Sequence, residues 1–423
     1  MDQTTVGDYR PILLVGGPGQ GKTTSLREIT KLIQAKSGML QIYLPFHDIC
    51  YAPEFFDQHS RQICVSSLEA NSEGLAEEFV KEYEKSKDVP LRVFKALTAI
   101  RKKYKIDFLV QADEIYDLNV LKSYPGHGKI FKYFIDEYVS TRHLKFLFTT
   151  SFQRKVAGDF EAHGLDHRIY HVPSLTRREI SVLLSESGFG KFRDLAQEIQ
   201  LITFGNPGYV KAFIDHALRG DPPINMNTVI SSFMPGAALE LKCRFNYEYL
   251  VGKSRGDGIV KYLLAVIAML DLPNLTEIAR NIDRSLGVTK DYLKWMLAVG
   301  LIDVEKKRYF FKDNLLRMWI GLFKSGKKPS RESIEAEINN LLNEGYERER
   351  LSEEGMESPS IEEISLQSKE SDGTQISAES DEIILPQLEK KPSEVSARKK
   401  ETVEKEPELT LPDMKQLEIE ELD

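Results

Sequence analysis

One stretch decides the fold that this sequence predicts: Ile12-Leu13-Leu14-Val15-Gly16-Gly17-Pro18-Gly19-Gln20-Gly21-Lys22-Thr23. Its first four residues are apolar and predict a short buried strand. Glycines follow the strand directly, and a helical pattern then runs from residue 22 to about residue 35. A buried strand that turns through glycines into a helix is typical of a parallel sheet covered by helices.

The glycine-rich segment fits the pattern G-x-x-x-x-G-K-[ST] in the strand-to-helix context that a phosphate-binding loop requires. Glycines let backbone N–H groups point at phosphate oxygens, and the positive end of the following helix faces the same oxygens. Lys22 would reach the β- and γ-phosphates, and Thr23 would ligate Mg²⁺. A glycine-rich turn without a ligand is the alternative. The predicted nucleotide-binding residues are Gly16, Gly17, Pro18, Gly19, Gln20, Gly21, Lys22, Thr23 and Thr24.

A pair of acids, Asp113 and Glu114, follows another apolar run about ninety residues downstream. At the end of a strand beside the phosphate-binding loop, Asp113 would hold Mg²⁺ through water. Glu114 would polarise an attacking water, a role worth about 10²–10⁴-fold in rate. The alternative is a strand that ends in a solvated Asp-Glu pair, and Gln111 makes this strand end less apolar than usual.

Apolar runs elsewhere in the chain extend the strand-and-helix pattern. Short strands are predicted at residues 40–44, 106–110, 144–148 and 168–172, and helical patterns fill much of residues 53–104. Strands that alternate with helices predict a doubly wound α/β fold with a parallel sheet. From residue 176 to residue 250 the pattern is almost wholly helical.

With these motifs in this order, the sequence resembles the AAA+ and STAND branch of P-loop ATPases, most closely the archaeal ATPase family, over roughly residues 10–320. The resemblance implies binding and hydrolysis of Mg-ATP. In that family the strand after the acidic pair ends in a small polar sensor, which Thr150 in Thr149-Thr150-Ser151 matches. Arg168 resembles an arginine finger, a group worth about 10³–10⁵ in rate. A surface arginine paired with a carboxylate is the alternative for Arg168.

The segment Gly205-Asn206-Pro207-Gly208 resembles the family's Gly-x-Pro motif, in which the proline, here Pro207, packs near the nucleotide. By itself the segment is also a simple turn between two helices. Origin-recognition relatives place an arginine sensor close by, where this chain has Gly208, and Lys211 could substitute for it. The resemblance and the absence of an N-K-x-D phrase favour ATP over GTP, although only about ten residues precede the first strand to hold the adenine.

Three helical stretches, at residues 258–270, 275–284 and 289–299, precede two short apolar segments that flank a charged turn. This is the order of a winged helix, with which the family often ends. Residues 251–328 contain 15 basic and 8 acidic residues, so double-stranded DNA is a candidate partner. The residues that would contact bases or phosphates are Thr289, Lys290, Lys294, Lys306, Lys307 and Arg308. A lid or a protein-binding role is the alternative.

The net charge of −8 is unevenly distributed along the chain. Residues 351–423 contain 21 acidic and 8 basic residues and no aromatic residue, whereas residues 1–350 carry a net charge of +5. Such a segment buries too little apolar surface to offset the entropy of ordering it, so we expect a disordered acidic tail. Its short apolar clusters could dock onto a protein partner, or they could be unselected residues of a linker.

The composition excludes several classes of protein. No run approaches the ~20 apolar residues of a membrane span, and the first residues lack the apolar stretch of a signal peptide. The three cysteines, Cys50, Cys64 and Cys243, are too few and too scattered for a disulfide framework or a zinc cluster. We therefore expect a soluble, cytoplasmic protein.

We divide the chain into a P-loop ATPase core at 1–172, an all-α lid at 173–250, a winged-helix domain at 251–328, a polar helix at 329–350 and the acidic tail at 351–423. The favoured function is an ATPase that moves its lid and winged helix, in an ATP-dependent oligomer if Arg168 acts on a neighbouring subunit. The alternatives are a non-catalytic scaffold that recruits a protein through the winged helix and tail, and a small-molecule kinase.

Overall fold

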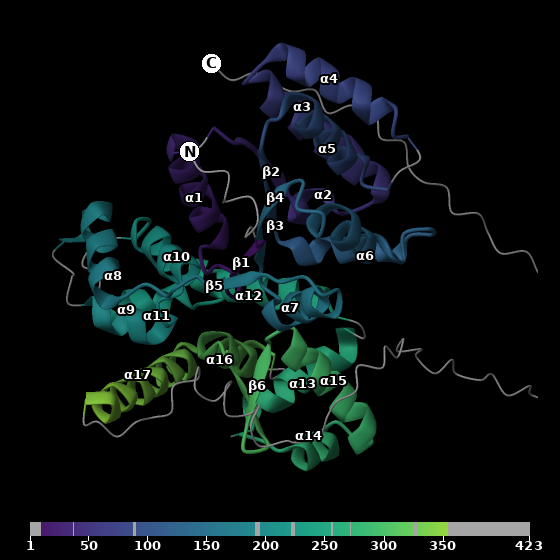
Figure 1. Cartoon of the computed structure of the whole chain (residues 1–423). Coiled ribbons are helices and arrows are strands. Elements are labelled where there is room, and N and C mark those ends of the chain that lie inside the picture. Colours follow the sequence, from purple (N-terminus) through teal and green to yellow (C-terminus); the bar gives the residue numbers. More distant parts are fainter. Residues whose placement is uncertain are drawn as a thin grey trace, which may run out of the picture. The chain divides into compact units, whose positions relative to one another are not determined.

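Five parallel strands form one sheet, as the apolar runs predict: β1 (Ile12–Val15), β2 (Leu40–Pro45), β3 (Phe108–Asp113), β4 (Lys145–Thr150) and β5 (Arg168–His171). Their order is β2-β3-β4-β1-β5, so the strand before the glycine-rich loop lies between β4 and β5 (Figure 1). Because all pairs are parallel, the loop and the ends of β3 and β4 meet at the carboxyl edge of the sheet.

The computed structural model describes residues 10–353, apart from residues 37, 88–89, 191–194, 221–224, 255–256, 271 and 325–327. All described residues belong to one compact unit. The predicted acidic tail lies outside the described residues except for residues 351–353, which continue the last helix.

Side chains of the strands alternate between two covered faces of the sheet. Helix α1 (Lys22–Lys36) covers one face, where Leu14, Leu26, Leu109 and Leu147 form a small apolar cluster. A larger apolar cluster covers the other face with residues from α2 (Phe46–Ile49), α3 (Pro53–Glu69), α4 (Glu73–Glu84), α5 (Arg92–Tyr104), η2 (Ile115–Ser123), α6 (Ile130–Phe134), η3 (Ile135–Val139) and α7 (Gln153–Ala162).

The predicted lid consists of helices joined by loops, with no strand among its described residues (Figure 1). A capping box of Thr176 and Glu179 starts its first helix, and Asn206 caps the helix that begins at Pro207. The helical elements are α8 (Arg177–Leu184), η4 (Ser185–Phe189), α9 (Ala196–Thr203), α10 (Pro207–Ala217), α11 (Met226–Ser232) and α12 (Ala238–Gly252).

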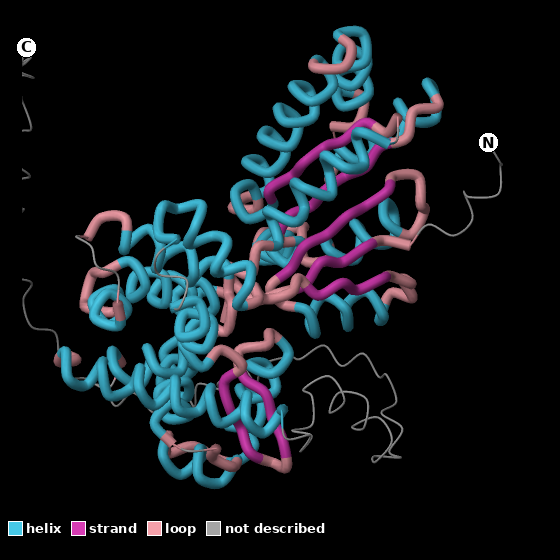
Figure 2. The backbone as a smooth tube through the Cα atoms, turned by 90° about the vertical axis from the view of Figure 1, so that its left-hand side faces the viewer, coloured by secondary structure: helices cyan, strands magenta, loops and turns pink. Residues whose placement is uncertain are grey.

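Three helices and an antiparallel hairpin follow in the predicted order, and Figure 2 shows the hairpin apart from the five-stranded sheet. These elements are α13 (Asp257–Met269), α14 (Leu275–Asn281), α15 (Leu286–Ala298), β6 (Ile302–Glu305) and β7 (Arg308–Phe311). Helix α16 (Asn314–Phe323) has no counterpart in the prediction. The polar helix is α17 (Arg331–Glu353), which buries Ile334, Ile338 and Leu341 as its periodicity predicts.

The lid and the C-terminal helices share one hydrophobic core, which runs from Ile180 to Leu342. Trp319 of α16 donates a hydrogen bond to the buried carboxylate of Glu240 in α12, with a separation of 3.2 Å. Helix α12 itself crosses residue 250, so the division predicted there marks no break in packing. The ion pair between Arg154 of α7 and Asp303 of β6, 3.0 Å apart, joins the hairpin to the helix that follows β4.

Gly205 makes the close contact between the start of the lid and α10. Its φ is +64°, its carbonyl accepts a 2.7 Å hydrogen bond from the N–H of Leu175, and a Cβ atom would overlap the Leu175 carbonyl oxygen. We expect Gly205→Ala to lower the free energy of unfolding by about 2–4 kcal/mol, because backbone would have to separate from backbone.

Urea denaturation would measure this loss. Gly74→Ala in the first turn of α4 is the matched control: no atom lies closer than 3.9 Å to its added Cβ, so stability should stay equal or rise by less than about 1 kcal/mol. Equal stability of the Gly205→Ala and wild-type proteins would contradict this contact.

Candidate nucleotide-binding site

The glycine-rich loop wraps around the side chain of Lys22. Gly19 and Gly21 have φ angles of +78° and +86°, in the left-handed region that glycine adopts without a steric penalty. The loop thereby brings the carbonyl oxygen of Gly17 within 3.1 Å of the Lys22 ammonium, which is 7% exposed. The backbone of the loop is therefore curled as a phosphate cradle requires.

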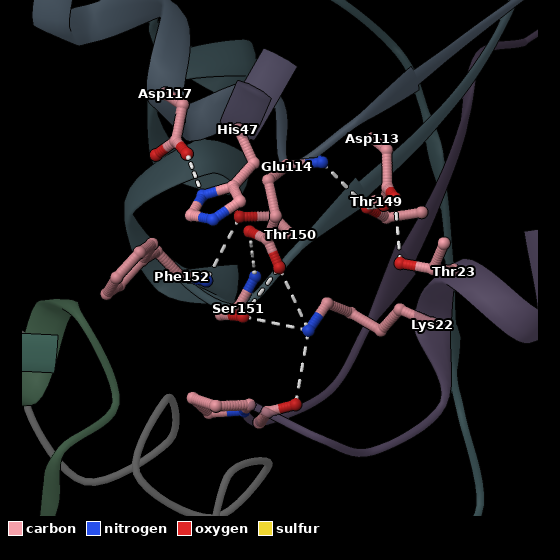
Figure 3. A network of polar contacts seen from close by, with 12 residues as sticks. Lys22, Thr23, His47, Asp113, Glu114, Asp117, Thr149, Thr150, Ser151 and Phe152 are labelled. Carbon is pink, nitrogen blue, oxygen red and sulfur yellow. Dashed lines mark hydrogen bonds and ion pairs between the residues drawn. The ribbon is translucent and has the colours of Figure 1, made fainter. Parts of the chain in front are cut away.

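Asp113 gathers hydroxyl groups from three elements. Its carboxylate accepts hydrogen bonds from Thr23 at 2.7 Å and from Thr149 (Figure 3). It accepts a third from Tyr43 at 2.9 Å. Burial, and next the charge of Asp113, raise the pKa of Tyr43 well above its ordinary value, so this hydroxyl remains a donor at neutral pH. The arrangement brings together the two predicted Mg²⁺ ligands, Thr23 and Asp113.

Glu114 forms an ion pair with the loop lysine. Its Oε1 lies 3.0 Å from Lys22 Nζ, and the backbone N–H and hydroxyl of Ser151 donate to the same carboxylate at 2.9 and 2.7 Å (Figure 3). Lys22 also donates to the Ser151 hydroxyl at 2.8 Å. Glu114 has a φ of +56°, a conformation that non-glycine residues rarely adopt outside sites where the surroundings hold them.

Thr150, the predicted sensor, points away from these acids. Its hydroxyl accepts a hydrogen bond from the N–H of Phe152 at 3.0 Å, and its side chain is fully buried. Strand alternation explains this, because Thr149 shares the α1 face with Leu147, whereas Thr150 shares the opposite face with Phe148. The structure places Ser151, not Thr150, beside Lys22 and Glu114.

The turn at residues 205–208 packs directly on the glycine-rich loop. Asn206 Nδ2 donates to the carbonyl of Pro18 at 3.2 Å, and the N–H of Gly208 donates to the carbonyl of Gly19 at 2.9 Å. Pro207 lies beside Gly21, since a Cβ atom there would be 3.7 Å from Pro207 Cγ. The lid therefore contacts the loop by donating hydrogen bonds to the carbonyl groups of Pro18 and Gly19.

The other predicted residues occupy varied positions around the loop. The N–H of Gly16 donates to the carbonyl of Thr150 at 3.4 Å, and Gln20 donates to Ser174 at 3.0 Å. Thr24 is exposed on α1. Lys211, considered as a substitute sensor, is exposed and pairs with Asp215 at 3.1 Å.

Arg168 lies at the edge of the sheet opposite to its own phosphate-binding loop. It is the first residue of β5 and pairs with Ile12, whereas the loop follows Val15, which pairs with His171. Arg168 is exposed at this amino edge. The structure does not bring it together with Lys22 or Glu114 in the same chain.

Four further residues lie at or near the site although the sequence did not predict them: Tyr43, Thr149, Ser151 and Lys242. Strand alternation could have found Tyr43 and Thr149, because each lies on the same face as the acid-bearing position of its neighbour strand. Lys242 lies within α12, more than two hundred residues from the loop, and has no local signal. Its Cε would lie 3.3 Å from a Cβ atom at Gly19.

The donor set suits a hydrated magnesium ion better than a metal held by protein alone. Among the described residues, no group of three or more histidine, cysteine or acidic side chains has the arrangement to hold a metal. Mg²⁺ commonly binds one or two protein oxygens together with waters and phosphates, and Thr23 with Asp113 fits that requirement.

In the described part of the chain, each helix is too short or too polar to span a bilayer.

Comparisons with known proteins identify the fold. No protein-family model matches the sequence, and no curated protein matches it significantly. The Walker-type ATPase of Pyrococcus abyssi has a similar structure, with a TM-score of 0.52 and 16% identity over 75% of this chain and 92% of that chain.

Two further solved structures align with lower scores. The ORC2 protein of Aeropyrum pernix has a TM-score of 0.41 at 11% identity, over 79% of this chain and 88% of that chain. Cdc6p of Pyrobaculum aerophilum has a TM-score of 0.35 at 14% identity, over 80% of this chain and 89% of that chain. Of the three, the Pyrococcus abyssi protein is similar enough to establish a common fold. The chain therefore has the P-loop ATPase fold.

Proposed function

We propose that this protein binds Mg-ATP at the loop of residues 16–23 and hydrolyses it. The observation that carries the proposal is the convergence of Lys22, the Thr23–Asp113 pair and Glu114 at one edge of the sheet. A glycine-rich turn without a ligand would need neither a buried lysine nor an acid pair beside it. The Pyrococcus abyssi neighbour, described as a Walker-type ATPase, supports the same assignment.

In this mechanism the loop amides and Lys22 bind the phosphates, and Thr23 with Asp113 hold the magnesium ion. When bound, that ion neutralises charge on the phosphate oxygens. Glu114 orients the attacking water and accepts its proton. Because Glu114 is paired with Lys22, phosphates that attract Lys22 weaken this ion pair and free the carboxylate for water. Ser151, which contacts both residues, takes the sensor role that the resemblance assigned to Thr150.

The lid offers a route from the nucleotide to the C-terminal helices. Tyr209 follows the residue that contacts the loop, and its hydroxyl donates to Asp313 at 2.6 Å and accepts from Asn246 at 3.0 Å. Asp313 caps α16 through the N–H of Leu316. Tyr209 and Asn246 are buried, so a shift of α10 on the loop would move the end of α16 with it.

The acid and the lysine have separable roles in the proposed reaction. At saturating Mg-ATP we expect Glu114→Gln to release phosphate at least about 10²-fold more slowly than wild type while it still binds ATP. Lys22→Ala should lose both binding and hydrolysis. A phosphate-release assay combined with nucleotide titration separates the two, and Lys211→Ala, altered at an exposed lysine, is the control. Undiminished hydrolysis in either site variant would contradict the assignment.

We further propose that the three helices and hairpin form a winged helix that binds double-stranded DNA. Exposure supports five of the six residues named from the sequence: Lys290, Lys294, Lys306, Lys307 and Arg308. Thr289 is fully buried and donates to the carbonyl of Ser285 at 2.9 Å, which corrects its assignment as a base-contacting residue. Arg308 pairs with Glu277 at 3.0 Å.

DNA affinity should fall steeply between 50 and 200 mM salt, because each phosphate contact releases counterions, with a slope of about −0.9 per contact. Replacement of the four exposed lysines by alanine should weaken binding and flatten this slope. Lys31→Ala combined with Lys85→Ala, two exposed lysines of the core, is the control, and fluorescence anisotropy measures both. Absence of binding would favour a scaffold that recruits a protein.

We also propose that Arg168 contacts the nucleotide of a neighbouring copy in an ATP-dependent oligomer. Its position at the amino edge of β5 supports a role between subunits over one within a chain. With ATP, wild type should gain mass by light scattering. Arg168→Ala should hydrolyse ATP at least about 10³-fold more slowly. A wild type that stays monomeric, with equal hydrolysis in the variant, would exclude this role.

A further inference from the structure

Helix α12 presents one stripe of side chains to the carboxyl edge of the sheet. Lys242, Phe245, Tyr249 and Lys253 are spaced by three or four residues and share one helix face. The stripe begins at the phosphate-binding loop, beside Lys242, and ends at η2, beside Lys253. The lid helix therefore lies along the proposed nucleotide site.

The far end of the stripe is held by complementary contacts with the core. Lys253 Nζ lies 2.7 Å from the carboxylate of Asp117, which is 2% exposed. The ring of Tyr249 stacks on Phe152 with centroids 6.0 Å apart and meets His47 edge-on at 5.7 Å. Oppositely charged and apolar groups thus anchor this end of α12.

The near end lacks such a counter-charge. Lys242 is half-buried, and within the part of the chain that the structure describes no acidic side chain pairs with it; its ammonium lies 5.1 Å from the ring centroid of Phe245. Burial lowers the pKa of Lys242, and the charge of Lys22 lowers it further. A half-buried cation without an acid partner is costly unless it binds an anion.

Two glycines make room for the Lys242 side chain at the loop. A Cβ atom at Gly208 would lie 3.0 Å from Lys242 Cε, and one at Gly19 would lie 3.3 Å from the same atom. Any larger residue at either position would push the stem away. The side chain therefore passes over the lid turn and reaches the phosphate-binding loop itself.

We propose that Lys242 is a second phosphate-binding residue of the nucleotide site, which the lid supplies opposite Lys22. This inference rests on the proposed function, because the anion is the polyphosphate of the bound nucleotide. The negative charge between the two ammonium groups draws α12 toward the loop while Lys253 and Tyr249 hold its other end. Lys242 thus couples occupation of the site to the position of the lid.

The test is titration of the full chain with N-methylanthraniloyl-ATP in the presence of Mg²⁺. Lys242→Met keeps an apolar stem of similar length and removes the charge, and we expect its affinity to be about 10-fold weaker or more. Lys242→Arg should bind within a few-fold of wild type. Lys155→Met, at an exposed lysine that pairs with Asp159 at 2.8 Å, is the matched control and should match wild type.

Two further measurements separate a phosphate contact from general damage. Inorganic tripolyphosphate, used as a competitor, should lose affinity for Lys242→Met by the same factor. Without nucleotide, the melting temperature of Lys242→Met should be no lower than that of wild type, because the substitution removes a half-buried charge that has no acid partner.

The outcomes distinguish the inference from the proposed function. If wild type binds neither the fluorescent nucleotide nor tripolyphosphate, the proposed function fails and the inference fails with it. If wild type binds and Lys242→Met binds equally tightly, the inference alone is wrong. Loss of affinity for the nucleotide without loss for tripolyphosphate would also overturn it, because the contact would then be to the base or ribose.

Discussion

The ion pair between Lys22 and Glu114 joins the two halves of the site. Lys22 begins α1 and Glu114 follows β3, so their 3.0 Å separation holds the glycine-rich loop against the strand that carries both acids. Ser151 connects the end of β4 to the same pair. Lysine and acid are each 13% exposed or less, which strengthens their attraction and makes it sensitive to a new anion.

At the turn the lid contacts this centre through backbone at Gly208 and through the side chains of Asn206 and Pro207. Gly208 approaches Gly19 so closely that a Cβ atom at Gly208 would lie 2.9 Å from the Gly19 Cα. A change in the shape of the loop would therefore displace helix α10 directly. Helix α12 adds charge to that contact through Lys242. Since lid and C-terminal helices share one hydrophobic core, a displacement of α10 and α12 is passed to the helices beyond residue 250 as a packed body.

Much of the fold follows from local patterns. Each of the five strands lies within three residues of an apolar run, and the helices before and after the hairpin follow their periodicity or their caps. Helix α16 was missed, although Leu315, Leu316, Met318, Trp319 and Ile320 are buried on it. Residues on both sides of residue 250 belong to one apolar cluster, which composition alone cannot show.

The sequence by itself determined the phosphate-binding loop and the acid pair, because both are short motifs whose chemistry depends on neighbouring residues. Strand alternation could have separated Thr149 from Thr150, but only the register of β4 against β1 and β3 places Ser151, which follows β4, beside Glu114. The sequence showed no sign of Lys242. That placement depends on contacts between residues far apart in the chain, which only tertiary packing creates.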